Sequence, residues 1–507
     1  MNVGIDLGTT NTVVSYLNEF DEWRTLSFSK GRSENPSMLP SCLCVVNSNE
    51  IKVGQDALDE RLVNANNFLC DTKYHMGDEK TVFSRGGITF TARLAAEKVL
   101  EEVMGELKRQ FPEEETFNAF VTVPARFLEA ARRETREALI KAGFEDNGDR
   151  RSLTDEPIAA AVAYSSALST ASNVLVVDYG GGTFDLSLVT TNTVGIASGM
   201  QNLSVKSWGG DLHLGGNDVD RLLINKMVEQ FVKNGGRSFD PFSTFNNSDE
   251  QRAAALICAQ PIEIKKQLFE DFTSEASVLV PDLLDGVDLE FYITPQEYED
   301  MMTDISVKYQ DCINKMFIQS KEVDISSVDT VLIVGGMAHE PCLRKVLVSL
   351  FHDESKLVIP DDSMYLVSKG ASIWNSNADV HVENKVYTSI GILLDGGKDV
   401  CQVVKEGDLI DDAGKLFSGN FRLTNSMSSN FLLSIVEYQG EFSPGNYTIL
   451  KSERVPVGRP RRTVFSFHNS PTVDVKIEIK MDADKLFCIT VKQNGIPDRL
   501  IDLRLGN

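Results

Sequence analysis

Asp178-Tyr179-Gly180-Gly181-Gly182-Thr183-Phe184-Asp185 follows an apolar run, Asn173–Val177, which has the composition of a buried strand. The chain opens in the same way, with Val3-Gly4-Ile5 leading into Asp6-Leu7-Gly8-Thr9-Thr10-Asn11. In both places an aspartate is followed by glycine and then threonine. Glycine has no Cβ and tolerates positive φ, so such turns bring backbone N–H groups close to a ligand and form a concave anion site. The pair predicts two loops that enclose a phosphate chain and its metal ion.

Either loop alone leaves two interpretations open, because a glycine-rich turn after a strand is also common in ordinary hairpins. A third junction favours phosphate binding. Val331–Val334 reads as another buried strand; Gly335-Gly336 follows it, and then Pro341 and a helical run, Cys342–Leu350. Three strand–glycine junctions, on a chain that alternates strands with helices, predict one nucleotide clamped between two related lobes.

Bulk properties narrow the class of protein. The 507 residues are 42% hydrophobic and 24% charged, which predicts a globular chain of two to four domains. No apolar run approaches the roughly 18 residues of a membrane span, and the N-terminus lacks an export-signal pattern. The eight cysteines form no CxxC pair, and the six histidines form no metal-ligand cluster. We therefore expect free thiols, a cytoplasmic location and no membrane insertion.

The net charge of −24 argues against binding to nucleic acid or to an anionic membrane. From Tyr387 onward, basic and acidic residues are equal in number, so the whole acidic excess lies before it. This difference in charge supports a domain boundary near that position.

The pattern of elements predicts an α/β domain over residues 1–377, a linker over 378–386 and an all-β sandwich over 387–507. In the first domain we expect a strand at Ala119–Val123 and helices at Leu128–Ala142 and Gln251–Glu270. Evenly spaced valines in the polar linker leave open a short docking strand. Strands of the tail are expected at Ser389–Leu394, Phe431–Tyr438, Val473–Met481 and Leu486–Lys492.

These residues resemble the 70-kDa heat-shock chaperone family (DnaK-like), whose members are ATP-gated peptide binders. The resemblance implies an actin-like, duplicated ATPase domain followed by an all-β sandwich domain. It marks the chain as a divergent short member, because no helical lid follows the sandwich before Asn507. The matching segments are Gly4–Asn11, Val121–Ala125, Asp155–Ala160, Asp178–Asp185, His213–Asp218 and Val331–Gly336, with looser matches at Leu416–Ser418, Gln439–Glu441 and Ile479–Thr490.

The resemblance implies ATP or ADP with Mg²⁺ as cofactors. Asp6 and Asp178 would hold the Mg²⁺, largely through its waters, as suits a small hard ion. The residues implied in catalysis are Lys73, Glu156, Asp178 and Thr183. The residues implied in nucleotide binding are Gly8, Thr9, Thr10, Asn11, Gly180, Gly181, Gly182, Gly215, Gly216, Glu263, Lys266, Gly335, Gly336, Met337 and His339.

Each catalytic assignment has an alternative. Lys73 aligns with the family lysine that orients the attacking water, but a solvated surface lysine is the default. Glu156 matches a carboxylate near the metal, or is a charge at a helix N-terminus. Thr183 lies beside the γ-phosphate or merely caps a turn. Pro124 and Arg132 occupy the positions of an interdomain relay, or are a helix-start proline and a surface arginine.

Two regions depart from the family. After Gly336 the family has small hydroxyl residues and an adenine-packing arginine, whereas this chain has Met337, Ala338 and His339. The ribose-binding glutamate and adenine-packing lysine would be Glu263 and Lys266, with a register uncertain by one residue. Base preference is therefore open.

In the tail, the positions that match the apolar peptide cleft can also be interpreted as core residues of the sandwich. These positions are Ile392, Phe417, Leu433 and Ile435.

The first hypothesis is an ATP-dependent chaperone that hydrolyses ATP slowly to regulate binding of unfolded or extended peptide segments. A J-domain protein and a nucleotide-exchange factor are its possible partners. The alternative is a nucleotide-binding scaffold or regulator of another chaperone, favoured by the altered loop and polar linker. A small-molecule kinase on the same fold is a third possibility, which the β-sandwich tail disfavours.

Overall fold

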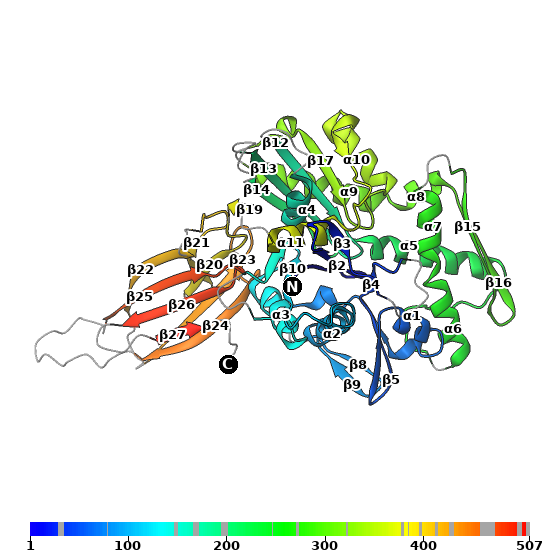
Figure 1. The fold of residues 1–507 in the computed structure, drawn as a ribbon, viewed down its shortest axis with the longest axis horizontal. Helices are drawn as coiled ribbons and strands as arrows, with labels where there is room; N and C mark the ends of the chain where they lie inside the picture. The colour runs from blue at the N-terminus through cyan, green and yellow to red at the C-terminus, as the bar shows by residue number, and fades with distance from the viewer. Residues whose placement is uncertain are drawn as a thin grey trace, which may run out of the picture. The chain divides into compact units, whose positions relative to one another are not determined.

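The computed structural model of the protein describes residues 1–28, 35–78, 80–146, 151–165, 172–193, 201–245, 247–269, 273–320, 323–376, 380–383, 385–394, 398–410, 414–424, 430–456, 472–493 and 499–502. It divides into two compact units. The first unit contains Met1–Arg126, Thr135–Asp146 and Thr154–Val382. The second contains Phe127–Glu134, Asn147–Leu153 and Glu383–Asn507. Figure 1 labels their elements.

One sheet of the first unit is built around β1 (Asn2–Leu7), and we call the part that contains it the first lobe. β1 pairs in parallel with β10 (Asn118–Val123) and antiparallel with β2 (Asn11–Leu17). The strand order is β11-β10-β1-β2-β3, with β4 paired to β2. β1 and β10 are mostly buried, as expected for central strands of an α/β layer.

A second sheet repeats this pattern, and we call its part of the unit the second lobe. β12 (Ser172–Tyr179) pairs in parallel with β17 (Thr330–Val334) and antiparallel with β13 (Phe184–Thr193). The strand order is β18-β17-β12-β13-β14-β19. In both lobes, therefore, the strand that ends near the key aspartate lies between an antiparallel hairpin partner and a later parallel strand. This shared topology supports the internal duplication.

The other elements complete the two lobes (Figure 1). The remaining strands are β3 (Trp23–Thr25), β4 (Leu39–Pro40), β5 (Leu43–Asn47), β6 (Glu50–Val53), β7 (Phe68–Leu69), β8 (Phe83–Arg85), β9 (Ile88–Phe90), β11 (Leu153–Asp155), β14 (Gln201–Asp211), β15 (Ala276–Leu284), β16 (Val287–Ile293), β18 (Leu357–Val358) and β19 (Val380–Glu383). The α-helices are α1 (Gln55–Arg61), α2 (Ala92–Gln110), α3 (Glu129–Lys141), α4 (Glu156–Ser165), α5 (Gly216–Lys233), α6 (Ser248–Ile257), α7 (Gln260–Leu268), α8 (Pro295–Met301), α9 (Thr303–Gln319), α10 (Pro341–Phe351) and α11 (Leu366–Ser376). The short 3-10 turns are Ala65–Asn67, Thr72–His75, Ile325–Ser327 and Glu354–Lys356.

Helices α4 and α11 pack against each other at the centre of the first unit. Their backbones approach closely at Gly370, where a Cβ would lie 1.7 Å from the carbonyl oxygen of Ala159. α4 is alanine-rich and buried nearly throughout, so small side chains form the contact surface. Its first residue, Glu156, is thereby fixed in the interior.

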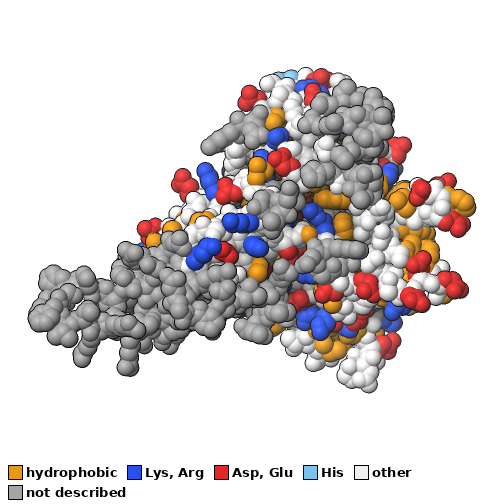
Figure 2. Space-filling view, turned by 60° about the vertical axis from the view of Figure 1, so that its left-hand side comes forward, with side chains coloured by type: hydrophobic (Ala, Val, Ile, Leu, Met, Phe, Trp, Pro, Cys, Tyr) orange, Lys and Arg blue, Asp and Glu red, His pale blue; other side chains and the backbone are white. Residues whose placement is uncertain are grey.

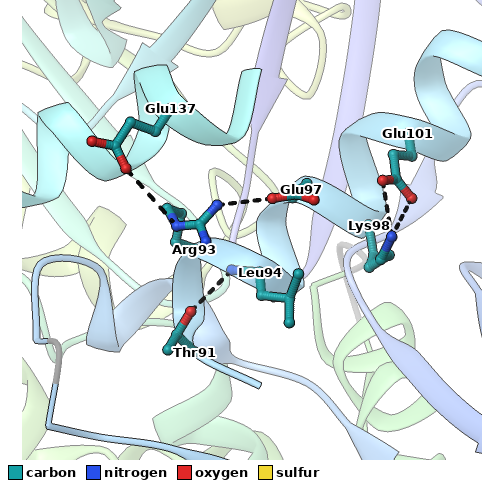
Figure 3. Close-up of polar contacts among 7 residues, drawn as sticks. All are labelled: Thr91, Arg93, Leu94, Glu97, Lys98, Glu101 and Glu137. Atoms are coloured by element: carbon teal, nitrogen blue, oxygen red, sulfur yellow. Dashed lines mark hydrogen bonds and ion pairs between the residues drawn. The ribbon is translucent and has the colours of Figure 1, made fainter. Parts of the chain in front are cut away.

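The start of α2 illustrates how the sequence determines a helix boundary (Figure 3). The hydroxyl of Thr91 accepts a hydrogen bond of 3.2 Å from the backbone N–H of Leu94, which satisfies one free donor of the first turn. Arg93 Nη1 lies 2.8 Å from Glu97 Oε2, and its Nε lies 3.9 Å from Glu137 Oε2 of α3. The arginine therefore connects α2 to the neighbouring helix.

The predicted helix Gln251–Glu270 is wrong as one element. The structure has two helices there, α6 and α7, separated by a short break. Pro261 lies in the first turn of α7, where a proline is tolerated because its missing N–H is not needed. Within the linker, β19 pairs at the edge of the second-lobe sheet, so the docking strand is present. Residues 378, 379 and 384 of the linker lie outside the described part.

The second unit contains two four-stranded sheets, ordered β21-β20-β23-β24 and β22-β25-β26-β27. Side chains from β20, β23, β25 and β26 meet in one apolar core, as in a β-sandwich. The four strands predicted for the tail all occur, whereas β21, β22, β24 and β27 were not predicted. The strand bounds are β20 (Ser389–Leu394), β21 (Asp399–Val404), β22 (Lys415–Thr424), β23 (Asn430–Tyr438), β24 (Tyr447–Pro456), β25 (Thr472–Met481), β26 (Phe487–Gln493) and β27 (Arg499–Asp502).

Acidic and basic side chains are interspersed on the face drawn in Figure 2. Among the described residues, no helix combines the length and apolar composition that a membrane crossing requires. The division into domains at 377 and 387 remains a prediction, since the second compact unit also includes Phe127–Glu134 and Asn147–Leu153.

Candidate nucleotide site

The two glycine–threonine turns of the first unit lie against each other. A Cβ on Gly181 would come within 1.9 Å of Thr10 Oγ1, and one on Gly182 within 2.4 Å of Thr9 Oγ1. Only glycine fits this approach, because the threonines of one turn occupy the space that side chains of the other would need. The predicted arrangement of two facing loops is therefore present.

Gly335-Gly336, the third strand–glycine junction, packs against the turn that follows Asp178. Gly335 has a φ of +91°, a conformation that favours glycine, and a Cβ there would lie 2.4 Å from the carbonyl oxygen of Tyr179. Gly215, predicted to contact nucleotide, packs instead on the loop itself, since its Cβ would lie 2.4 Å from the carbonyl oxygen of Gly181. Gly215 also does not line the cavity that opens beside these turns.

A cavity of about 420 Å³ opens beside these turns, which is the size of a typical small-molecule site. Its wall includes most of the residues predicted to bind nucleotide or metal. The lining residues are Asp6, Gly8, Thr9, Thr10, Asn11, Val13, Met38, Lys73, Glu156, Asp178, Gly180, Gly181, Gly182, Thr183, Gly216, Asn217, Asp220, Ile262, Lys265, Lys266, Phe269, Gly335, Gly336, Met337 and Met364.

Lys73 is buried beside the turns and is not a solvated surface lysine. Its Nζ lies 2.6 Å from Glu156 Oε1, and both side chains are about one tenth exposed or less. Burial alone would lower the pKa of this ammonium, but the negative charges of Glu156 and Asp6 raise it above its ordinary value. Lys73 therefore stays charged within the site.

Acidic side chains outnumber this single ammonium. Burial, and then the charge of Glu156, raises the pKa of Asp6 to about 7, although Thr122 Oγ1 donates a hydrogen bond of 3.2 Å to its Oδ1. The same causes raise the pKa of Asp178 well above its usual value. Such a cluster is stabilised by a bound cation, because a positive charge offsets the mutual repulsion of buried carboxylates.

Asp185 is a further member of this cluster that the sequence analysis did not assign to the site. It lies directly opposite Asp178 in the β12–β13 register and is 1% exposed. Burial, followed by the charge of Glu156, raises its pKa to about 7. The sequence could have indicated this residue, because Asp185 ends the Asp178–Asp185 motif and lies on the adjoining strand.

The donor set fits Mg²⁺ that is held through water. Among the described residues, no group of three or more His, Cys, Asp or Glu side chains is placed to ligate a metal directly. Asp6 and Asp178 both face the cavity, next to the glycine-rich turns. Mg²⁺ keeps several of its waters in such sites, so two carboxylates without further direct ligands are sufficient.

Asn217 joins the two lobes at the cavity wall. Its Nδ2 donates a hydrogen bond of 2.6 Å to Asp71 Oδ1, and its Oδ1 accepts one of 3.3 Å from Thr10 Oγ1. An amide can do both, whereas a carboxylate at this position could not donate to Asp71. Asp71 was not predicted, because only the fold brings it near α5.

Two residues predicted to contact the nucleoside, Glu263 and His339, do not line this cavity. The face of α7 that lines the cavity carries Ile262, Lys265 and Lys266, at the three- and four-residue spacing of one helix side, and Phe269, the residue directly after α7, continues it. Glu263 falls off this face, and its Oε1 accepts a hydrogen bond of 3.4 Å from Gln267 Nε2.

His339 is the second of these residues. It is exposed in a turn and does not line the cavity, whereas Met337 is buried and does. The turn after Gly336 points the methionine inward and places the histidine on the surface.

Pro124 and Arg132, the residues predicted to form an interdomain relay, are both buried. Arg132 is 3% exposed, and its Nε donates a hydrogen bond of 3.0 Å to the carbonyl oxygen of Phe127, so it is not a surface arginine. Pro124 is buried between β10 and α3, and α3 begins only at Glu129, so it is not a helix-start proline. Their role as an interdomain relay stays a prediction.

Three of the predicted cleft positions pack into the core of the sandwich. Ile392, Leu433 and Ile435 are each at most 3% exposed and lie in the cluster shared by the two sheets. Phe417 is partly buried against that cluster. The structure thus gives them the core role that the sequence also allowed, because side chains that fill the space between two sheets are not open to a peptide.

Comparison with known proteins agrees with this fold. The model of the family described as "Hsp70 protein" matches residues 2–395. The chain is 25% identical over 529 aligned residues to "Heat shock 70 kDa protein" of Ajellomyces capsulatus, covering 97% of this chain and 69% of that protein. It is 28% identical over 431 residues to "Heat shock 70 kDa protein 2" of Paracoccidioides lutzii, covering 78% of this chain and 62% of the relative.

A bacterial relative is similar over a shorter range. "Chaperone protein DnaK" of Thermosipho melanesiensis is 29% identical over 383 residues, which cover 73% of this chain and 58% of that protein. The matches thus leave part of each relative's length uncovered. Since the family model spans most of the sequence, the chain belongs to the Hsp70 family and has its actin-like, duplicated ATPase domain followed by a β-sandwich.

Proposed function

We propose that this protein is an ATP-dependent molecular chaperone that hydrolyses ATP slowly to regulate the binding of unfolded or extended peptide segments. Membership of the Hsp70 family supports a chaperone-type function. The observation that carries the proposal is the contact between the two glycine–threonine turns beside the buried Lys73–Glu156 pair. These groups border one cavity of about 420 Å³.

The residues of the cavity suit a nucleoside triphosphate. Backbone N–H groups of the Gly180–Thr183 turn, together with Thr9 and Thr10, would bind the phosphates. Asp6 and Asp178 would hold Mg²⁺ through its waters, and the bound ion would supply positive charge to the phosphate oxygens. These assignments rest on the lining of the cavity and on the excess of buried carboxylates.

Hydrolysis would depend on positioning more than on covalent chemistry. Lys73 is held at a fixed place by Glu156, so its ammonium can donate a hydrogen bond to the attacking water or the γ-phosphate. Asp185, opposite Asp178 in the strand register, would accept a proton or a water hydrogen bond in the same region. Thr183 would contact the γ-phosphate from the end of its turn.

Peptide binding is assigned to the sandwich by family alone. A J-domain protein and a nucleotide-exchange factor are the partners that this function would require. A second candidate function is a nucleotide-binding scaffold that regulates another chaperone. The core positions of Ile392, Leu433 and Ile435 favour it, because they leave fewer candidates for an apolar peptide cleft.

Phosphate release from ATP by the full-length protein, measured with and without a J-domain protein, tests the proposal. A parallel assay follows a fluorescent extended peptide in the presence and absence of ATP. Slow turnover together with ATP-dependent peptide release supports the chaperone. Magnesium-dependent ATP binding without turnover or peptide binding supports the scaffold.

A further inference from the structure

The residues that line the cavity fall into two chemically different groups. One group contains the glycine-rich turns, the buried carboxylates and Lys73. The other contains the cavity-lining residues of α7 and the three methionines Met38, Met337 and Met364, of which Met337 adjoins the turns: a Cβ on Gly216 would lie 3.1 Å from its Sδ. If the phosphates bind to the first group, the sugar and base must lie along the second. The nature of that second wall therefore determines which nucleoside is accepted.

Apolar side chains dominate this second wall. Ile262 projects from α7, Phe269 follows the last residue of this helix, and the three methionines Met38, Met337 and Met364 also line the wall. Methionine is unbranched and polarisable, so it adapts to rings of different outline. The Phe269 ring can stack on any base, because every base has a π-face.

The charged groups of this wall provide little fixed recognition. Lys265 Nζ lies 2.7 Å from Asp220 Oδ1, so these two side chains already satisfy each other's charge. Lys266 is exposed, and an ammonium on a flexible stem fixes no particular hydrogen-bond geometry. Glu263 lies off the lining face, so it does not present a carboxylate to the ribose hydroxyls.

We propose that this site accepts nucleoside triphosphates as a class, with little discrimination by base or by the ribose 2′-hydroxyl. The inference rests on the proposed nucleotide binding and extends it to specificity. A site that hydrogen-bonds a substrate hydroxyl rejects the analogue without it by about 10⁴-fold or more, whereas an apolar wall discriminates by only about 10- to 200-fold. Because apolar side chains dominate the wall of this cavity, we expect the weaker discrimination of an apolar wall.

The test is calorimetric titration of the full-length protein with Mg²⁺ and, in turn, ATP, 2′-deoxy-ATP, GTP and inorganic tripolyphosphate. 2′-Deoxy-ATP and GTP are expected to bind within about tenfold of ATP. Tripolyphosphate should bind more weakly than all three, because it lacks the group that covers the apolar wall. A loss of more than about 100-fold for 2′-deoxy-ATP or GTP overturns the inference. Absence of binding by every ligand instead removes the proposed function itself.

Two single substitutions on α7 test whether its cavity-lining face contacts the nucleoside. Ile262 is 55% exposed and lines the cavity, so Ile262→Glu adds a carboxylate to the wall without opening the core. This variant should favour ATP over 2′-deoxy-ATP by more than wild-type protein does. An unchanged ratio would place the nucleoside elsewhere and contradict the assignment.

Glu263→Ala changes the adjacent residue, which lies off the lining face. Its ratio of ATP to 2′-deoxy-ATP affinity is expected to match that of wild-type protein. If Glu263→Ala lowered the affinity for ATP by more than about tenfold but left the affinity for 2′-deoxy-ATP unchanged, Glu263 would be a ribose ligand and the inference would be overturned.

Discussion

Lys73 Nζ donates a hydrogen bond of 2.6 Å to Glu156 Oε1, and this bond joins a 3-10 turn of the first lobe to the first residue of α4. The two residues are far apart in sequence, yet both side chains are buried at the cavity. Because each partner compensates the charge of the other, the ammonium is held at one position. This pair is the centre of the proposed catalytic arrangement.

The substitution Lys73→Ala is expected to reduce ATP turnover by about 100- to 1,000-fold, the cost of removing one preorganised donor. ATP binding should stay near that of wild-type protein, since the turns that bind phosphate are unchanged. Single-turnover phosphate release, combined with calorimetry, separates the two effects. Lys98→Ala is the matched control, because it removes a lysine from a surface ion pair with Glu101 (Figure 3). Equal turnover in wild-type and Lys73→Ala protein would exclude the proposed role.

Gly182→Ala is expected to weaken ATP binding by about tenfold or more. The new Cβ would lie 2.4 Å from Thr9 Oγ1, so the two turns must separate, at a cost of about 1–3 kcal/mol. Titration with ATP and Mg²⁺ measures the change, and circular dichroism confirms that the variant is folded. Wild-type affinity in a folded Gly182→Ala protein would show that the contact between the turns is not needed for binding.

Gly370→Ala should destabilise the first unit by about 1–3 kcal/mol or more, because its Cβ would collide with the carbonyl oxygen of Ala159 where α4 and α11 pack. Gly105→Ala is the opposite case. Gly105 lies inside α2 with no atom near the added Cβ, so alanine should stabilise by about 0.5–1 kcal/mol. Urea unfolding of both variants tests the pair. A Gly370→Ala protein as stable as wild-type would contradict the packing described here.

Glu437 should make stability depend on pH. Burial raises the pKa of this carboxyl to about 7, although Thr388 Oγ1 donates it a hydrogen bond of 2.8 Å. Hydrogen bonding by the backbone of Glu129, and the charge of Arg132, oppose the shift. A raised pKa means that the folded state holds a proton that the unfolded state releases. The contribution of Glu437 is therefore fully present below its unfolded pKa and is lost as the pH rises through about 7.

The variant Glu437→Gln removes this titration while preserving the shape of the side chain. The difference in unfolding free energy between Glu437→Gln and wild-type protein should grow in favour of the variant as pH rises from 5 to about 8, by up to about 1.4 kcal/mol per pH unit. Urea unfolding at several pH values measures it. A difference that does not change with pH would mean that Glu437 is ionised in the folded protein throughout this range.

The repeated aspartate–glycine–threonine pattern predicted the most important part of the site, because each copy is a local turn directly after a strand. Both turns form, and both are preceded by a buried strand with the same pairing pattern. Local chemistry was enough for this part, since a glycine that admits a close approach is required at the turn itself.

Residues that depend on distant contacts were harder to predict. Asp71 reaches the site only because the fold brings it to Asn217. The sequence could not show whether Glu263 or its neighbour lines the cavity, because a shift of one residue on a helix turns a side chain by about 100°. Asp185 was not predicted as a site residue, although it is the last residue of the Asp178–Asp185 motif. Only the strand register shows that it lies opposite Asp178.

Calorimetric titration of ATP into the full-length protein, in Mg²⁺ and again in excess chelator, tests the central claim most directly. The facing turns and the excess of buried carboxylates predict binding that is strong with Mg²⁺ and is greatly weakened without it. No measurable heat with ATP and Mg²⁺, or equal binding with and without the ion, would contradict the account.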